Sequence, residues 1–220
     1  MKLARESHPY LLVGLAVAAA GALLGFAYLS AGALLLSGFV AYFFRDPTRE
    51  VPSEPGLVVS PGDGRVVEIR TLPERGQIRV SIFLSLFDVH INRAPIAGVV
   101  RSVHYQPGRF LPANLERAAL ENERNDLTIE CEIGDVRLSQ IAGVVARRIV
   151  CWKKAGDRVS AGERIGLIQF GSRLEVVLPP GVQVEVVVGS KVKGGSSILA
   201  RIPAGLPRRE ELEFAQAHAR

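Results

Sequence analysis

The stretch GLIQFGSRLEV, residues 166–176, joins two β-prone runs through a single Gly-Ser pair. A lone glycine in such a run most simply predicts a strand that is interrupted by a bulge. Any chemical role for Gly171 and Ser172 must therefore be supported by the rest of the chain.

The residues around this stretch predict a mostly β domain. From residue 57 onward, short runs of β-prone residues are separated by Gly, Pro and Asp. One helix is expected at residues 113–123, with Asn114 as a candidate N-cap. A β-sandwich or barrel follows as the fold class, and its predicted strands cover residues 57–59, 65–69, 78–84, 99–105, 127–133, 136–141 and 144–150.

An internal repeat appears near the end of this domain. Residues 156–165 (GDRVSAGERI) are echoed by residues 189–198 (GSKVKGGSSI), with glycines and apolar positions in register. Each copy reads as a turn, a strand residue, a second turn and a returning strand, which resembles the half-motifs of lipoyl-like β-sandwich domains. The repeat aligns a second Gly-Ser pair, Gly195-Ser196, with a simple turn, so that pair is expected to be structural.

The N-terminal segment is apolar, with no charged residue from Pro9 to Phe44. As one helix it would be about 54 Å long, whereas the hydrocarbon core of a bilayer is about 30 Å thick. Residues 1–50 are therefore expected to form a membrane-associated hydrophobic helical hairpin, broken at residues 30–32. Basic residues on both flanks predict that both ends are cytoplasmic and that the β domain faces the cytoplasm at the cell membrane. An interfacial or re-entrant hairpin stays open because the second helix is short.

The charge and the cysteine content of the chain limit the kinds of partner that are expected. The net charge is +5 and the pI about 9.6, but the charge is diffuse, so an anionic membrane surface is favoured over nucleic acid. Cys131 and Cys151 lack a CxxC spacing and a nearby histidine, so neither a metal site nor a disulfide framework is expected. The β domain is expected to span residues 51–206, followed by a charged tail at 207–220.

Polar residues that are uncommon in a β domain gather in a few further segments. SPGDG, residues 60–64, places the Asp63 carboxylate in a tight turn. FDVHINRAP, residues 87–95, brings an acid, an imidazole, an amide and a guanidinium together, and at a strand end Asp88, His90 and Asn92 would share one face. Residues 105–110 and 122–125 are polar loops that could line a pocket. Taken singly, the turn and the two loops are more often structural, whereas the density of polar residues at 87–95 makes a functional role about as frequent as a structural one.

Together and in this order, the segments resemble the short, membrane-associated branch of the phosphatidylserine decarboxylases. The resemblance runs from about residue 41 to about residue 200. The blocks that carry it are AYFFRDP (41–47), SPGDG (60–64), FDVHINRAP (87–95), NERN (122–125), QIAGVVARRI (140–149) and GERIGLIQFGSR (162–173).

The resemblance implies a proenzyme that cuts itself between Gly171 and Ser172. The beta chain would be residues 1–171 and the alpha chain residues 172–220, and the two would stay associated, with a homo-oligomer left open. Ser172 would become a covalent pyruvoyl group, the only cofactor implied. Asp63 and His90 would assist. The longer branch carries two histidines in the segment that matches residues 87–95, whereas here Arg93 takes the second place.

The chemistry accounts for these residue types. Attack by the Ser172 hydroxyl on the Gly171 carbonyl needs a base, for which His90, oriented by Asp63, is the candidate. Glycine before the serine leaves the carbonyl unobstructed. Because the second histidine is missing, either His90 serves both maturation and turnover or another group takes one role. His104 is near in sequence, but nothing in the family pattern selects it.

The resemblance also implies the turnover chemistry. The ketone would condense with the amine of the serine head group and take up the electrons that carbon dioxide leaves behind. His90 would then return a proton to carbon. Arg93, Arg173 and Asn92 are candidates for binding the lipid phosphate or carboxylate.

The predicted function is thus pyruvoyl-dependent decarboxylation of phosphatidylserine to phosphatidylethanolamine and carbon dioxide. One alternative is the same reaction on another serine-headed phospholipid, such as archaetidylserine. Another is a non-enzymatic, membrane-anchored lipoyl-like adaptor, which would give residues 88–95 no purpose and would remain a single chain.

Overall fold

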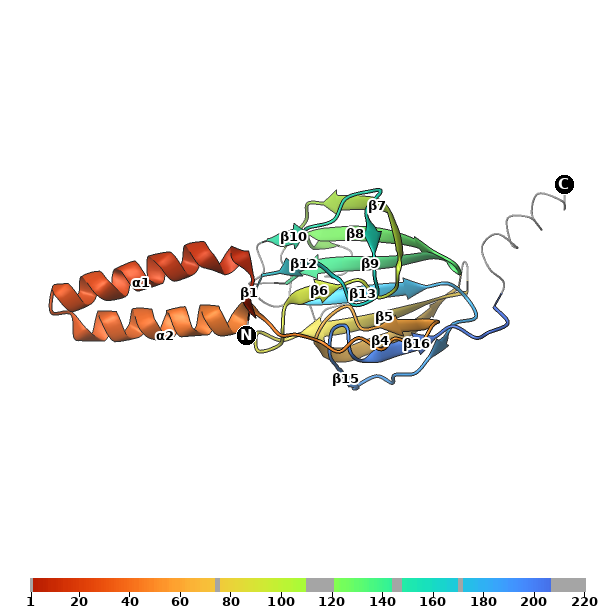
Figure 1. The fold of residues 1–220 in the computed structure, drawn as a ribbon, viewed down its shortest axis with the longest axis horizontal. Helices are drawn as coiled ribbons and strands as arrows, with labels where there is room; N and C mark the ends of the chain where they lie inside the picture. Colours follow the sequence, from red (N-terminus) through yellow and green to blue (C-terminus); the bar gives the residue numbers. More distant parts are fainter. Residues whose placement is uncertain (1, 74–75, 110–120, 144–147, 170–171, 207–220) are drawn as a thin grey trace. The chain divides into compact units, whose positions relative to one another are not determined.

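The computed structural model describes residues 2–73, 76–109, 121–143, 148–169 and 172–206. These residues belong to two compact units, Met1–Thr48 and Arg49–Arg220 (Figure 1). The first unit is helical and the second is built from strands, so the mostly β class that the sequence predicts is confirmed.

The N-terminal unit pairs two helices, α1 (His8–Leu23) and α2 (Ala27–Phe43), after a 3-10 turn at Arg5–Ser7. Strand β1 (Lys2–Leu3) pairs with β2 (Arg45–Asp46) at its base. The predicted break at residues 30–32 is wrong. The chain turns at Gly25, whose φ of +78° suits glycine, whereas Ser30 lies within α2 and donates from Oγ to the Ala18 carbonyl over 2.8 Å.

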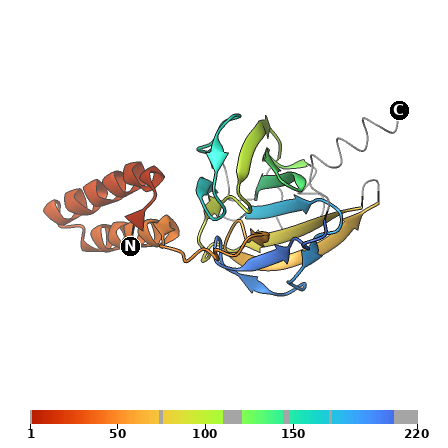
Figure 2. The ribbon, with the colours of Figure 1, turned by 45° about the vertical axis from the view of Figure 1, so that its right-hand side comes forward.

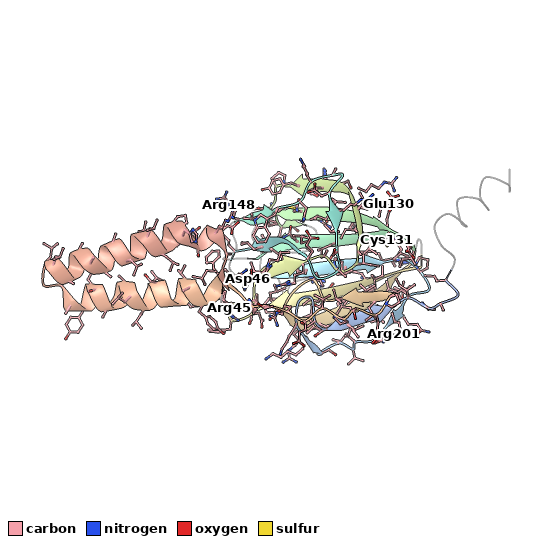
Figure 3. The ribbon with its side chains drawn as sticks, viewed as in Figure 1. Arg45, Asp46, Glu130, Cys131, Arg148 and Arg201 are labelled. Atoms are coloured by element: carbon pink, nitrogen blue, oxygen red, sulfur yellow. The ribbon has the colours of Figure 1, made fainter. Side chains whose placement is uncertain are left out.

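Small residues let the two helices approach closely. A Cβ at Gly14 would overlap Ser37 Oγ, and one at Gly21 would lie 3.2 Å from the Ser30 nitrogen. Large apolar side chains project outward from both helices instead (Figure 3). In the described part of the chain, no helix has both the length and the apolar character needed to cross a membrane.

The second unit is organised on an antiparallel sheet of eight strands, in the order β11-β7-β8-β9-β13-β5-β4-β15. The sheet curls around a core (Figure 2). Its strands are β4 (Gly64–Leu72), β5 (Gln77–Leu84), β7 (Gly98–Gln106), β8 (Arg124–Cys131), β9 (Gly134–Ala142), β11 (Arg158–Val159), β13 (Ser172–Leu178) and β15 (Lys191–Val192).

Two three-stranded sheets accompany it. One has the order β10-β12-β6, from β10 (Ile149–Cys151), β12 (Arg164–Ile168) and β6 (Ile91–Arg93). The other has the order β14-β16-β3, from β14 (Gln183–Val184), β16 (Ile198–Arg201) and β3 (Leu57–Val59). Val58, Ile165 and Leu199 from these small sheets share one buried apolar cluster with Leu138 and Leu174 of the large sheet.

The strands predicted between residues 57 and 141 are confirmed, with small shifts of their ends. Of the strand predicted at 144–150, the last residues lie in β10 and residues 144–147 fall outside the described part. Most of the helix predicted at 113–123 and the whole tail at 207–220 fall outside it as well.

The two repeat copies bind equivalent partners. Gly156 donates from its nitrogen to the Val100 carbonyl, and Gly189 does the same to the Val66 carbonyl, both over 2.8 Å. Gly162 in turn donates to the Ala94 carbonyl and Gly195 to the Ser60 carbonyl, again over 2.8 Å. The partners are themselves similar in sequence, SPGDGRV at 60–66 and APIAGVV at 94–100.

Those two partner segments also bind each other reciprocally. Val59 donates from its nitrogen to the Pro95 carbonyl, and Arg93 donates to the Pro61 carbonyl, each over 2.8 Å. Reciprocal bonds of this kind are what a local two-fold axis produces. The C-terminal repeat is therefore part of a larger duplication.

Equivalent glycines in this duplication, Gly64 and Gly98, begin β4 and β7 where a neighbouring backbone comes close. A Cβ at Gly98 would overlap the Glu130 carbonyl oxygen. We expect Gly98→Ala to lower the free energy of unfolding by about 2–3 kcal/mol, because the strands must move apart. Gly156→Ala is the control, since its Cβ would meet nothing within 4 Å and only its positive φ costs about 1 kcal/mol. Urea unfolding measures both, and equal losses would contradict the prediction.

Candidate active site

Ser172 is the first residue of β13, which lies between β5 and β9. It pairs with Leu84 on one side and Ala142 on the other. Side chains alternate along a strand, so Ser172 shares the core-facing side of β13 with Leu174, Val176 and Leu178, all of which are buried. The hydroxyl therefore points to the interior of the curled sheet.

The Ser172 side chain is fully buried, and its Oγ has no hydrogen-bond partner among the described residues. A buried hydroxyl is usually hydrogen-bonded, because desolvation without a partner costs about 1–3 kcal/mol. The contacts described for the fold give no structural reason for a hydroxyl at this place. A chemical role is the natural explanation.

A chain of amide side chains runs along the same interior. Asn125 on β8 donates from Nδ2 to Gln140 Oε1 on β9 over 2.9 Å. Gln140 donates from Nε2 to Asn92 Oδ1 on β6 over 2.8 Å. All three residues are at most 2% exposed. At its end, Asn92 Nδ2 is buried without a partner in the described part of the chain.

The end of this amide chain lies near Ser172. A Cβ at Gly62 would be 3.7 Å from Asn92 Nδ2, 3.5 Å from Leu84 Cδ2 and 2.5 Å from Leu174 Cδ1. Leu84 is the cross-strand neighbour of Ser172, and Leu174 follows it on the same face. Gly62 is thus close both to the unpartnered amide and to the two leucines that neighbour the unpartnered hydroxyl.

His90 flanks the segment that leads to Ser172. It is 2% exposed, and its carbonyl accepts from the Ile168 nitrogen over 3.4 Å. The ring Nδ1 lies 3.0 Å from the Asp88 carbonyl oxygen. Because a carbonyl only accepts, Nδ1 carries the proton, and Nε2 is the basic nitrogen of the neutral ring. The ring is therefore set up to take a proton.

The expectation that Asp88, His90 and Asn92 share a strand face is wrong, because β6 begins only at Ile91. The Asp88 carboxylate turns back to accept from the Ser85 nitrogen and hydroxyl, at 2.8 and 2.7 Å. Asp88 thus contributes its backbone carbonyl, and not its side chain, to the surroundings of His90.

Asp63 holds the turn beside Asn92. Its carboxylate receives Arg49 Nη2 at 2.7 and 2.9 Å and the Gly194 nitrogen at 2.8 Å. The contact described for His90 Nδ1 is instead the Asp88 carbonyl. The idea that Asp63 orients His90 directly is therefore not supported by these contacts. Asp63 is better placed to fix Gly62 against Leu174 and Asn92.

Arg93 is a buried residue whose described contact is structural. It is 6% exposed, and its Nη1 donates to the Gly162 carbonyl over 2.8 Å. A Cβ at Gly195 would lie 2.9 Å from Arg93 Cδ. The side chain thus packs between the two repeat copies, which differs from the lipid contact considered from the sequence.

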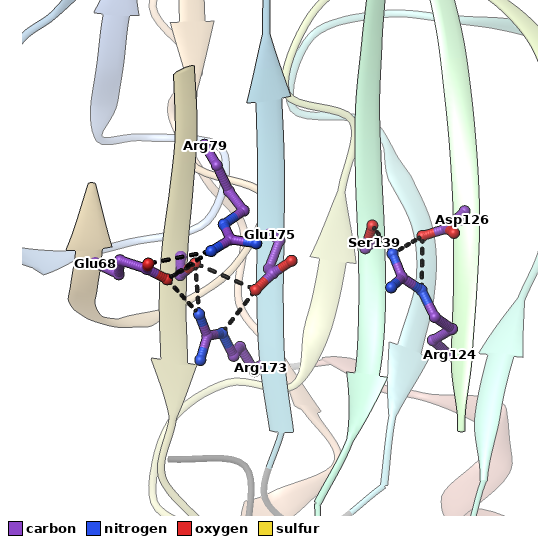
Figure 4. A network of polar contacts seen from close by, with 8 residues as sticks. Glu68, Arg79, Arg124, Asp126, Ser139, Arg173 and Glu175 are labelled. Carbon is purple, nitrogen blue, oxygen red and sulfur yellow. Dashed lines mark hydrogen bonds and ion pairs between the residues drawn. The ribbon is translucent and has the colours of Figure 1, made fainter. Parts of the chain in front are cut away.

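Arg173 is on the opposite face of β13 from Ser172. It donates from Nη2 to Glu68 Oε2 at 2.7 Å and to Ser81 Oγ at 2.9 Å, and its Nε lies 2.9 Å from Glu175 Oε1 (Figure 4). Arg173 and Glu175 are only 3% and 4% exposed. The described contacts of Arg173 are therefore structural, which differs from the lipid contact considered from the sequence. Its guanidinium ties the start of β13 to β4 and β5.

The same network lowers the pKa of Glu68. Burial alone would raise this pKa, but hydrogen bonds and positive charge from Arg79 and Arg173 outweigh it, so the pKa lies below the usual carboxyl value. The resulting stabilisation is present above the ordinary carboxyl pKa. It is lost as the pH falls through the lowered one.

Sequence reasoning missed Gln140 and Asn125, although a signal existed. Val136, Leu138 and Ala142 are apolar at alternate positions of β9, and Gln140 interrupts them. Asn125 similarly precedes Leu127 and Ile129 on β8. A polar residue at a core position needs a partner, so such interruptions predict a buried polar contact, although not its members.

Comparison with known proteins shows the family. A family model described as phosphatidylserine decarboxylase matches residues 36–200. A phosphatidylserine decarboxylase proenzyme of Solibacter usitatus is 50% identical over 168 residues, which cover 76% of this chain and 81% of the relative. Proteins of the same name from Beijerinckia indica and Burkholderia mallei are 47% and 43% identical, covering 80% and 91% of this chain and 79% and 95% of theirs. The chain therefore belongs to the phosphatidylserine decarboxylase family.

The ionic network yields a stability prediction. Arg173→Met leaves the buried Glu175 carboxylate without its cation and should lower the free energy of unfolding by about 3 kcal/mol. Adding Glu175→Gln should recover part of the loss, because the unpaired charge is then gone. Urea unfolding in a Ser172→Ala background, where the chain is expected to stay whole, measures both. A single variant as stable as its parent would contradict the assignment.

Proposed function

We infer that this chain is an enzyme that decarboxylates phosphatidylserine to phosphatidylethanolamine and carbon dioxide, after it has cut itself between Gly171 and Ser172. The observation that carries the inference is the fully buried Ser172 hydroxyl without a described partner, at the start of a central strand. Family membership supports it, since the named relatives are proenzymes of that activity.

The cut is chemistry of the chain itself. The Ser172 oxygen bonds to the carbonyl carbon of residue 171, the peptide C–N bond breaks, and the serine proton passes through a base to the departing nitrogen. Loss of the Cα proton then breaks the Cβ–O bond of the ester and releases a carboxylate on residue 171. Water replaces the remaining nitrogen, which leaves as ammonia, and a ketone remains at the new N-terminus.

His90 is the proposed base. Its Nδ1 faces the Asp88 carbonyl, so Nε2 can accept the serine proton, and its burial keeps water from competing. The fixed tautomer matters because only one ring nitrogen is basic at a time. Asp63 acts at a distance in this scheme, as a positioning residue that holds Gly62 against Leu174.

Ser172 fits the pyruvoyl group of this proposal, because no described hydrogen bond of the fold would be lost when its hydroxyl is consumed. The group supplies an electron-withdrawing ketone that reacts with an amine and takes up the electrons released with carbon dioxide. The chain's own part is to exclude water through the apolar neighbours Leu84 and Leu174. His90 can then hold a proton ready for the carbon that loses the carboxylate.

We also propose that the N-terminal helix pair inserts into the cytoplasmic face of the cell membrane, where the lipid substrate lies. Polar and small residues are used between the helices, whereas the outer surface presents Leu12, Leu23, Tyr28 and Leu35 to the surroundings, each more than half exposed. Such a surface is stable in lipid and costly in water.

The duplicated turns of the second unit support a relationship to lipoyl-like half-motifs at the level of the fold.

Self-cleavage is tested by electrophoresis and intact mass. Wild-type protein should give two fragments that meet at residues 171 and 172, the smaller one with a carbonyl at its N-terminus that hydroxylamine traps. Ser172→Ala should remain one chain and be inactive, because the attacking oxygen is gone. Ser196→Ala is the matched control at another Gly-Ser pair and should cleave normally. A wild-type chain that stays whole yet decarboxylates phosphatidylserine would sink the proposal.

Membrane attachment is tested by flotation with phosphatidylserine-containing vesicles. Leu23→Lys combined with Leu35→Lys should reduce vesicle binding roughly tenfold or more, because each lysine places a charge on an inserted surface. Val187→Lys is the control, since Val187 is a 70% exposed apolar residue of the second unit. Equal binding of the double variant and the parent would rule out insertion through these helices.

A further inference from the structure

The end of the buried amide chain assigns a donor to the interior of the site. In the order Asn125, Gln140, Asn92, each amide donates its nitrogen to the oxygen of the next. An amide whose oxygen is occupied must present its NH2 group on the other side. Asn92 therefore offers a hydrogen-bond donor, and its Nδ2 is buried with no partner in the described residues.

The surrounding backbone is shaped to let this chain form. Gly166 of β12 pairs with Asn92. A Cβ at Gly166 would overlap the Val150 carbonyl and lie 3.2 Å from Gln140 Nε2. The absence of a side chain there leaves room for Gln140 to reach across from the large sheet to Asn92 on a small one.

The donor lies in the same part of the interior as the leucines that neighbour Ser172. A Cβ at Gly62 would have Asn92 Nδ2, Leu84 Cδ2 and Leu174 Cδ1 all within 4 Å, and Leu84 pairs with Ser172. When the Ser172 hydroxyl attacks the preceding carbonyl, that carbonyl oxygen becomes negatively charged. In an apolar interior, such a charge needs a fixed donor, and a neutral amide supplies one without the desolvation cost of a buried cation.

We propose that Asn92 Nδ2 donates a hydrogen bond to the oxygen that becomes negative during self-cleavage, and that Gln140 and Asn125 position it. This inference rests on the proposed self-cleavage at Ser172. It replaces the role in lipid binding considered for Asn92, and it makes Gln140 and Asn125 positioning residues that need not touch any substrate.

The test follows the rate of self-cleavage in freshly expressed full-length chain. Asn92→Asp and Asn92→Leu should slow the appearance of the two fragments by about 10²–10³, the usual effect of removing one oxyanion donor. Gln140→Met cannot donate to Asn92 Oδ1, so Asn92 loses its fixed orientation. That variant should slow cleavage roughly tenfold, which corresponds to one buried hydrogen bond.

A hydroxylamine pulse identifies the step that is slowed. Hydroxylamine cuts the ester that forms after attack and releases fragment 172–220 with an intact N-terminal serine. If Asn92 assists attack, its variants should yield less of this fragment than the wild type. An excess of it would place the defect at the later elimination and overturn the proposal.

Ser139→Ala is the matched control. Ser139 is buried on the opposite face of the same strand as Gln140, where it accepts from Arg124 over 3.1 Å. It should cleave at the wild-type rate. Equal slowing by Ser139→Ala would show that general packing decides the rate, and the proposal would fall.

Two further outcomes would also overturn it. The first is that Asn92 variants retain the melting temperature of the parent, cleave at the normal rate and keep the parent's KM. The second is that they cleave at the normal rate but show a raised KM for phosphatidylserine, which would return Asn92 to lipid binding. Failure of the wild-type chain to cleave at all is a separate result, because it refutes the proposed function before any variant is compared.

Discussion

The hydrogen-bonded ladders on both sides of β13 are the constraint on which the rest of the molecule depends. Ser172 begins this strand, and from its first residue it pairs with β5 on one side and β9 on the other. A residue that is held from two sides has little freedom, although the chain just before it is the proposed place of a cut. The sheet therefore fixes the position of Ser172 without needing the preceding peptide bond.

The two faces of β13 carry different kinds of side chain. The outer face carries Arg173 and Glu175, which pair with each other; Arg173 also forms an ion pair with Glu68 of β4, and both residues share hydrogen bonds with Ser81 of β5 (Figure 4). The inner face carries Ser172 in an apolar interior with a few amides. A strand period of two makes this separation possible within four residues. Ion pairs hold the strand on the face of Arg173 and Glu175, whereas the residues of β13 on the face of Ser172 are uncharged.

How much of this could be read from the sequence depends on the range of each interaction. Strands between residues 57 and 141 follow from local alternation, and the repeat follows from glycine spacing. The helix break was misplaced because Gly25 and Gly32 are equal as local signals, whereas packing of Ser30 against Ala18 decides between them. The serine at the site was identified by motif, which needs no structure.

The surroundings of that serine could not be derived in the same way. Asn92, Gln140 and Asn125 come from three strands, and only the register of β8, β9, β12 and β6 brings them together. Arg173 is a candidate ligand in the sequence because it follows Ser172, although adjacent residues of a strand face opposite sides. The sequence suggests that Asp63 orients His90 because a carboxylate commonly orients a catalytic histidine. The contacts described for these residues are instead with the Gly194 nitrogen and with the Asp88 carbonyl.

The duplication has a consequence for the architecture of the matured protein. A cut before Ser172 would leave one repeat copy, residues 156–165, on the first fragment and the other, residues 189–198, on the second. The second copy bonds to Ser60 and Val66 of the first fragment, and β13, β15 and β16 find their strand partners there too. Three of the four duplicated segments would thus lie on the first fragment and the fourth on the second, so neither fragment would hold the complete duplication. If the proposed cut occurs, the matured molecule would be an obligate heterodimer made from one gene product, whose subunits need no interface beyond the one they folded with.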